Sequence, residues 1–146
     1  MLLVEQASDR RRKVSEQNKG LVRRYFEDVL NGRDLDAVET FFADERLVNG
    51  VRGGCFSYFT AFPDLHCSID ELIAEGDRVF CRSTMTGTHD GEYKGIPPTG
   101  RHIATEAAEV YRIADGRFVG YWCLTNVAGL MRQLTEESAV ATTLAS

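Results

Sequence analysis

Two strand-like segments joined by an Asp-Gly dipeptide constrain the fold of this chain more than any other feature. Residues 102–113 and 117–125 are rich in β-branched and aromatic side chains, and Asp115-Gly116 lies in the connection between them. Asp-Gly suits a type I′ turn, because both central residues of that turn have positive φ. The sequence therefore predicts an antiparallel hairpin.

Two more strands are predicted before this hairpin. Residues 65–74 and 78–88 have strand composition and are separated by the turn sequence Glu75-Gly76-Asp77. Residues 91–100 contain two prolines and three glycines, which indicates a loop leading into the hairpin. We therefore expect four antiparallel strands in a meander.

The first half of the chain shows helical spacing instead. Between Asn18, a plausible N-cap, and the stop sequence Asn31-Gly32, six apolar residues recur on one helical face: Leu21, Val22, Tyr25, Phe26, Val29 and Leu30. Asp34 is placed to cap a second helix. Residues 48–62 are interpreted as a glycine-containing loop and a short helix ending before Pro63, and residues 127–134 as a last short helix.

Helices followed by a meander indicate an α+β fold, with N-terminal helices packed on a curved, mainly antiparallel sheet. We divide the chain into a charged N-terminal leader, residues 1–17, a single domain, residues 18–135, and a C-terminal tail, residues 136–146, that we expect to fray.

Composition narrows the range of partners. The 146 residues carry a formal net charge of −5, whereas nucleic-acid-binding proteins usually present a basic face. The basic run Arg10-Arg11-Arg12-Lys13 is interpreted as a solvated arm. No apolar run approaches 18 residues, and the N-terminus does not resemble a signal peptide. We expect a cytoplasmic protein with no nucleic-acid or membrane partner.

The sequence offers no pattern typical of a cofactor or metal site. The four cysteines form no CxxC pair, the three histidines form no HxH or HExxH motif, and no dinucleotide or phosphate loop is present. We expect reduced thiols, no metal and no cofactor, so any chemistry would rest on acid–base groups in a pocket.

Strand alternation selects one carboxylate for that role. Five residues share a face of the strand at 102–113: Ile103, Thr105, Ala107, Glu109 and Tyr111. If this face is the inner one, Glu109 lies among apolar neighbours, which would raise its pKa and suit it to general acid or base catalysis. The alternatives are a solvent-facing charge or a buried carboxylate paired with Arg82 or Arg112.

Further candidates lie around this position. His102 is the second catalytic candidate, with a role at the rim of the sheet as its alternative. The substrate-binding candidates are Tyr25, Arg82, Tyr121, Trp122, Cys123 and Asn126. Core or interface packing is the alternative for Tyr121, Trp122 and Cys123, and a helix N-cap is the alternative for Asn126.

Several segments resemble the SnoaL-like polyketide cyclases: residues 18–26, 31–38, 61–65, 87–89, 95–101, 111–117 and 129–134. The resemblance implies the cone-shaped α+β barrel of nuclear transport factor two and ketosteroid isomerase, which encloses one deep, mostly apolar pocket and commonly forms a homodimer. It also implies ring closure by intramolecular aldol condensation, without metal or cofactor.

Two departures from the family pattern accompany the resemblance. Cys123 occupies the position of the catalytic aspartate of the aldol cyclases, and Glu109 occupies that of their supporting histidine. The resemblance therefore leaves Glu109 as the best pocket carboxylate. The stretch 43–62 is also shorter than usual, which predicts a wider or reshaped cavity.

The function predicted from these observations is acid–base ring closure on a bulky, apolar polyketide or other secondary-metabolite intermediate. The reaction is either an aldol cyclisation or an epoxide opening in which a Tyr or His protonates the epoxide oxygen. A non-catalytic binding or interaction module of the same fold is the main alternative. A nucleophilic role for Cys123 is a third hypothesis, and it requires a lowered thiol pKa.

Overall fold

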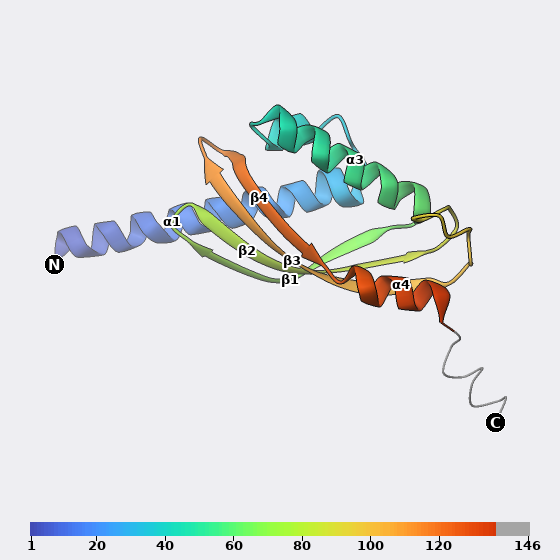
Figure 1. Cartoon of the computed structure of the whole chain (residues 1–146). Coiled ribbons are helices and arrows are strands. Elements are labelled where there is room, and N and C mark those ends of the chain that lie inside the picture. Colours follow the sequence, from blue (N-terminus) through green and yellow to red (C-terminus); the bar gives the residue numbers. More distant parts are fainter. Residues whose placement is uncertain (137–146) are drawn as a thin grey trace, which may run out of the picture.

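The computed structural model describes residues 1–136 and shows helices packed on a four-stranded antiparallel sheet (Figure 1). The predicted α+β class is confirmed. Nearly all of the predicted C-terminal tail lies outside the described residues. None of the helices within residues 1–136 is long and apolar enough to cross a membrane.

The four strands follow the predicted meander closely. They are β1 (His66–Glu75), β2 (Arg78–Thr88), β3 (His102–Ala114) and β4 (Arg117–Thr125), and they pair in chain order. Asp115 and Gly116 have φ of +51° and +74°, as the predicted type I′ turn requires. The hairpin prediction is confirmed.

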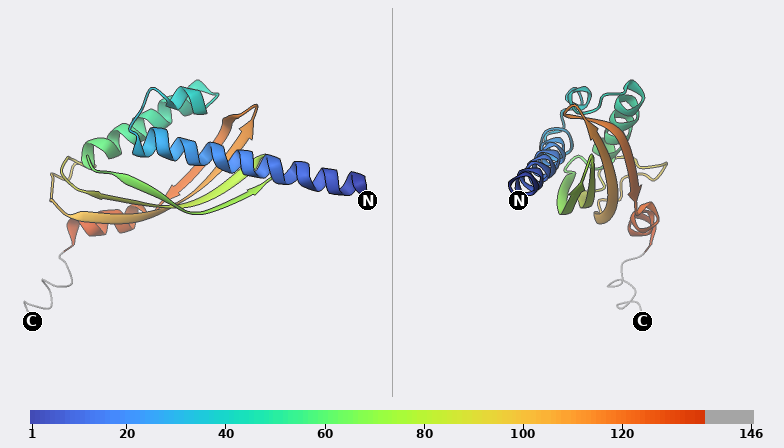
Figure 2. Two further views of the ribbon diagram at one scale, coloured as in Figure 1. Left: turned by 180° about the vertical axis from the view of Figure 1, so that it is seen from behind. Right: turned by 90° about the vertical axis from the view of Figure 1, so that its left-hand side faces the viewer.

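The sheet curves strongly but does not close into a barrel (Figure 2). Strands β1 and β4 are both edges of the four-stranded sheet. Near its start, β4 is partly covered, because Phe42 bridges Phe118 and the Ala43 backbone N–H donates to the Phe118 carbonyl at 3.0 Å. Helices therefore complete the wall that strands would form in a closed barrel.

The N-terminal leader is helical, which corrects the predicted helix start. Helix α1 (Leu2–Tyr25) runs without interruption through Asn18, whose side-chain Nδ2 donates to the Gly76 carbonyl at 3.3 Å instead of capping a helix. Residues 2–17 contain neither Pro nor Gly, so nothing in them stops the helix of the following segment from extending N-terminally. In Figure 1 this N-terminal part projects past the sheet.

The predicted stop at Asn31-Gly32 is confirmed. Helix α1 continues into one wider π-helical segment, η1 (Phe26–Asn31), which ends at Gly32. A Cβ at Gly32 would lie 2.4 Å from the Asp28 carbonyl oxygen, so only glycine fits there. The Asn31 side chain then pairs with both backbone groups of Cys67 and ties η1 to β1.

Helix α3 (Glu45–Ala61) corrects the interpretation of residues 48–62 as a loop followed by a short helix. The helix is continuous through three glycines and ends before Pro63, as expected. It begins at Asp44, whose carboxylate accepts hydrogen bonds from the Arg46 and Leu47 backbone N–H groups at 2.7 and 3.3 Å. This N-cap stabilises the first turn and offsets part of the unfavourable glycine content.

Two shorter helices complete the fold. Helix α2 (Val38–Phe41) follows a turn in which the Asp34 carboxylate accepts from the backbone of residues 36 and 37. Helix α4 (Val127–Thr135) begins at Asn126, whose side chain accepts from the Gly129 N–H at 3.0 Å. Asn126 is therefore the N-cap of α4, which was the alternative to a substrate-binding role.

The hydrophobic core consists of two clusters that lie toward opposite ends of the concave face of the sheet. At one end an aromatic cluster packs around Tyr25, whose ring makes edge contacts with Phe41, Phe42 and Phe118 at centroid distances of 5.4 to 5.7 Å. At the other end Phe62 lies in a second apolar cluster. Because both ends are filled by side chains, the space left between them is confined to the middle of the sheet.

Asp44→Ala should lower the free energy of unfolding by about 1 kcal/mol, because two backbone N–H groups at the start of α3 lose their acceptor. Asp44→Asn keeps an acceptor oxygen and serves as the matched control. Chemical denaturation measures both variants. Equal losses for Ala and Asn would show that the cap contributes nothing.

Candidate functional site

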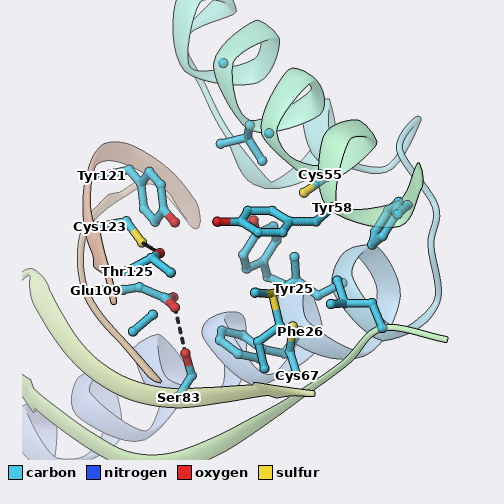
Figure 3. Close-up of a pocket in the computed structure, with 18 of the residues that line it drawn as sticks. Tyr25, Phe26, Cys55, Tyr58, Cys67, Ser83, Glu109, Tyr121, Cys123 and Thr125 are labelled. Atoms are coloured by element: carbon cyan, nitrogen blue, oxygen red, sulfur yellow. Dashed lines mark hydrogen bonds between the residues drawn. The ribbon is translucent and has the colours of Figure 1, made fainter. Parts of the chain in front are cut away.

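A cavity of about 280 Å³ lies between α3 and the concave face of the sheet (Figure 3). Its walls come from α1, η1, α3 and all four strands. The lining is mostly apolar or aromatic, with Arg46 and Glu109 as its charged members. A pocket with this composition suits a bulky apolar ligand held by a few polar contacts.

Glu109 is the buried carboxylate of this cavity. Glu109 is only 6% exposed, and both of its carboxylate oxygens accept hydrogen bonds from hydroxyl groups. Ser83 Oγ donates to Oε1 at 2.8 Å, and the Tyr111 hydroxyl donates to Oε2. The carboxylate is therefore held by neutral donors, and none of the ion pairs found within residues 1–136 involves it.

Burial raises the pKa of Glu109 above its ordinary value, because the ionised form loses its contact with water. The hydrogen bonds from Tyr111 and Ser83 act in the opposite direction, since they stabilise the carboxylate. Burial is the larger effect. Such a group exchanges a proton closer to neutral pH than an exposed glutamate does, which suits acid–base chemistry.

Strand register explains why this side chain faces inward. Glu109 pairs with Cys81 on β2 and with Cys123 on β4, so these residues form one row across the sheet. The predicted inner face of β3 is the buried one, since Ile103, Thr105 and Tyr111 are also buried. Glu109 therefore lies on the inner face, which is the condition under which its burial is expected to raise its pKa.

Three phenols add hydroxyl groups to the cavity wall. Tyr25, Tyr58 and Tyr121 all line it, from α1, α3 and β4. Burial raises the pKa of each of them, so each stays protonated and can donate a hydrogen bond. In Figure 3 the hydroxyls of Tyr58 and Tyr121 point into the space in front of Glu109.

Three thiols also line the cavity. Burial raises the pKa of Cys55 to about 11 and that of Cys67 to about 12, so neither is an activated nucleophile at neutral pH. Cys123 is the exposed one, and its Sγ lies 3.5 Å from Thr125 Oγ1. All four cysteines are free, as expected from their spacing.

The predicted site residues fall into two groups. Four of them line the cavity: Glu109, Tyr25, Tyr121 and Cys123. The other four do not line it: His102, Arg82, Trp122 and Asn126. Strand alternation places the side chains of the first three of these on the outer face, and Asn126 serves as a helix cap.

The position of Arg82 explains why it does not form an ion pair with Glu109. Its guanidinium lies on the outer face, 3.6 Å from both Asp70 and Glu71 and 3.9 Å from Glu106. Because neighbouring side chains on a strand point to opposite faces, Arg82 and Ser83 cannot both reach the cavity. Ser83 takes the inner position and supplies the hydrogen bond.

Sequence reasoning missed Ser83, Tyr111 and Tyr58 as site residues. Alternation along 78–88 places Ser83 on the same inner face as Val79 and Cys81, so this signal was present. Tyr58 had no such signal, because its segment was divided between a loop and a short helix. Once α3 is continuous, a face repeating every three or four residues brings Leu47, Val51 and Tyr58 into the cavity.

The arrangement supplies one titratable carboxylate opposite several neutral hydroxyl donors in a mostly apolar space. This combination can remove a proton at one point of a ligand and stabilise developing negative charge on an oxygen at another. Within residues 1–136 no group of three His, Cys, Asp or Glu side chains is placed to hold a metal ion.

Comparison with known families decides the classification. The family model of the SnoaL-like polyketide cyclases matches residues 20–134. The chain belongs to the SnoaL-like polyketide cyclase family. The resemblance seen in the sequence is thus confirmed, and it spans all four strands and the helices that cover them. No protein of curated function matches the sequence at a significant level.

Several solved structures have the same fold. TsrD from Streptomyces laurentii superposes with a TM-score of 0.74 at 26% identity, covering 84% of this chain and 97% of its own. AclR from Streptomyces galilaeus, described as a candidate hydroxylase, gives 0.73 at 25%, covering 90% of both chains. IdmH from Streptomyces antibioticus, described as a candidate polyketide cyclase, gives 0.71 at 25%, covering 81% and 98%.

Ser83→Ala should raise the pKa of Glu109 further, because the carboxylate loses a hydrogen bond that stabilises its ionised form. Carbon-13 NMR of the glutamate carboxyl groups during a pH titration measures the change, and Glu109→Gln assigns the signal. Thr84→Val is the matched control, since Thr84 bonds Asp70 on the outer face instead. An unchanged or lowered pKa in Ser83→Ala would contradict the assignment.

Proposed function

We propose that this protein is a cofactor-independent cyclase that closes a ring in a polyketide or related secondary-metabolite intermediate. The observation that carries the proposal is Glu109, a carboxylate of raised pKa held by two hydroxyls inside an apolar cavity. Membership of the SnoaL-like polyketide cyclase family supports it, as does the apolar lining of the cavity.

In an aldol closure, Glu109 removes a proton from the carbon next to a substrate carbonyl. The resulting enolate attacks a second carbonyl carbon of the same molecule, so that a carbon–carbon bond forms and the attacked carbonyl becomes an alkoxide. A phenol such as Tyr58 or Tyr121 donates a hydrogen bond to that oxygen. The proton held by Glu109 returns to the alkoxide, which restores the carboxylate.

An epoxide opening uses the same groups. Glu109 takes the proton of a substrate hydroxyl, and the hydroxyl oxygen attacks an epoxide carbon. The carbon–oxygen bond of the epoxide breaks, and the oxygen released receives its proton from a neighbouring phenol. The proton on Glu109 then returns to that phenol, so the protein ends unchanged.

The cavity itself supplies much of the catalysis in either reaction. Holding the two reacting groups of one flexible molecule together gives effective molarities of roughly 10⁵–10⁸ M. A positioned acid–base group adds about 10²–10⁴-fold. One buried carboxylate in a shaped apolar pocket is therefore sufficient for ring closure of an activated substrate.

A second candidate function is binding without catalysis. It is favoured by Cys123, because the family resemblance implies a catalytic aspartate of the aldol cyclases at this position. Cys123 lines the cavity beside Glu109 in the register of the sheet, so the aspartate is lost from the centre of the site. A protein that binds an apolar metabolite tightly and returns it unchanged would fit this alternative.

Glu109→Gln should slow cyclisation of a naphthyl-substituted 1,5-diketone at least about tenfold, because the amide cannot accept the substrate proton. Loss of water from the hydroxyketone formed by the aldol step gives a conjugated cyclohexenone, whose absorbance follows the reaction. Glu106→Gln, an exposed position on the outer face of the same strand, is the matched control and should retain the wild-type rate. Binding of the diketone without conversion would favour the non-catalytic function.

We further propose a homodimer through the outer face of the sheet. One cross-strand row on that face consists of Ile73, Phe80, Val110 and Trp122, and Leu124 adjoins it. Ile73, Trp122 and Leu124 are 54%, 53% and 63% exposed. An apolar row of this kind on a surface is typical of an interface between proteins.

Trp122→Glu should convert the dimer to a monomer, because it places a charge in the middle of an apolar contact. Light scattering coupled to size-exclusion chromatography measures the mass. His102→Glu, which adds a carboxylate on the same outer face of the sheet but at the start of β3, away from the apolar row, serves as the control. A wild-type protein that elutes as a monomer would overturn this part of the proposal.

A further inference from the structure

A second hollow lies on the surface beside the C-terminal half of α3. Its lining residues come from that helix and from the loop after β2: Gly54, Phe56, Ser57, Tyr58, Thr60, Glu92, Tyr93 and Lys94. Gly54 and Tyr58 also line the main cavity. The two hollows therefore border the same two residues.

Gly54 has open space at the position of a side chain. A Cβ built on it would find no atom within 4 Å, and its φ does not lie in the left-handed region, so neither packing nor backbone geometry requires glycine there. On the helix it lies between Val51 and Tyr58, both of which line the cavity. A side chain at this position would extend into open space beside a residue that borders both hollows.

Tyr93 lines the outer hollow and carries a buried hydroxyl group. Tyr93 is 4% exposed, and its hydroxyl makes no hydrogen bond within residues 1–136. Its ring stacks on Tyr58 with centroids 5.8 Å apart, and the Lys94 ammonium lies 5.8 Å from the ring centre. A buried donor of this kind is usually satisfied, so a ligand oxygen accepting from it would be favourable.

We propose that the outer hollow is a second binding subsite of the cavity and that Gly54 is the opening through which an elongated ligand reaches it. Such a ligand places a proton-donating group at Glu109, an apolar segment over Gly54, and an oxygen acceptor, neutral or anionic, near Tyr93 and Lys94. The inference rests on the proposed function only in using Glu109 as the anchor of the inner end.

The test compares two naphthol probes by their fluorescence on binding. The first is 2-naphthol, whose hydroxyl suits Glu109, and the second carries a butanoic acid chain on the opposite end of the ring. Each buried methylene strengthens binding roughly fourfold, so the chain should raise wild-type affinity by about tenfold or more. Gly54→Leu should abolish that gain while 2-naphthol still binds.

Gly53→Leu is the matched control. Gly53 belongs to the same helix, lies outside both hollows and also has open space around its Cβ position. This variant should keep the full chain-dependent gain, and thermal unfolding should show both variants folded. An equal gain in Gly54→Leu and in wild type would overturn the subsite alone. Failure of wild type to bind 2-naphthol would overturn the subsite and also count against Glu109 as the anchor.

Discussion

The pair of hydrogen bonds that Ser83 and Tyr111 donate to Glu109 determines what this cavity can do. Both hydroxyls are neutral, so the carboxylate is satisfied without a cation that would fix its charge. An adjacent Arg or Lys would keep the group ionised and hold its pKa down, whereas burial among apolar side chains raises it. The acid–base character of the site therefore depends on Glu109 having no ion pair within residues 1–136, and the guanidinium of Arg82 pairs with carboxylates on the outer face instead.

The shape of the cavity depends on where aromatic side chains fill the concave face of the sheet and where α3 has glycines in place of larger residues. The cluster around Tyr25 fills one end of the concave sheet, and the cluster around Phe62 fills the other. Helix α3 covers the middle of the concave face of the sheet. At Gly50 and Gly54 its backbone lines the cavity without a side chain. Each glycine weakens the helix by up to about 1 kcal/mol relative to alanine, and the Asp44 cap offsets part of that loss.

Strand residues could be predicted well, because a strand alternates between two faces and turn sequences mark its ends. The bounds of β2 and β4, the hairpin at Asp115 and the set of residues that share a strand face with Glu109 all follow from these patterns. Helical segments could be predicted less well. Glycine composition suggested a loop where α3 is continuous, since local propensity favours a break that packing against the sheet overrides.

The sequence by itself determined the α+β class, the family and the set of residues that share a strand face with Glu109, since these depend on the order of segments along the chain and on alternation within one strand. Only the tertiary structure decided which groups meet that carboxylate. Ser83 and Tyr58 reach the cavity from β2 and α3, and Arg82, Trp122 and Asn126 are kept out of it. These outcomes depend on the register between strands and the placement of α3 over the sheet, which no single segment specifies.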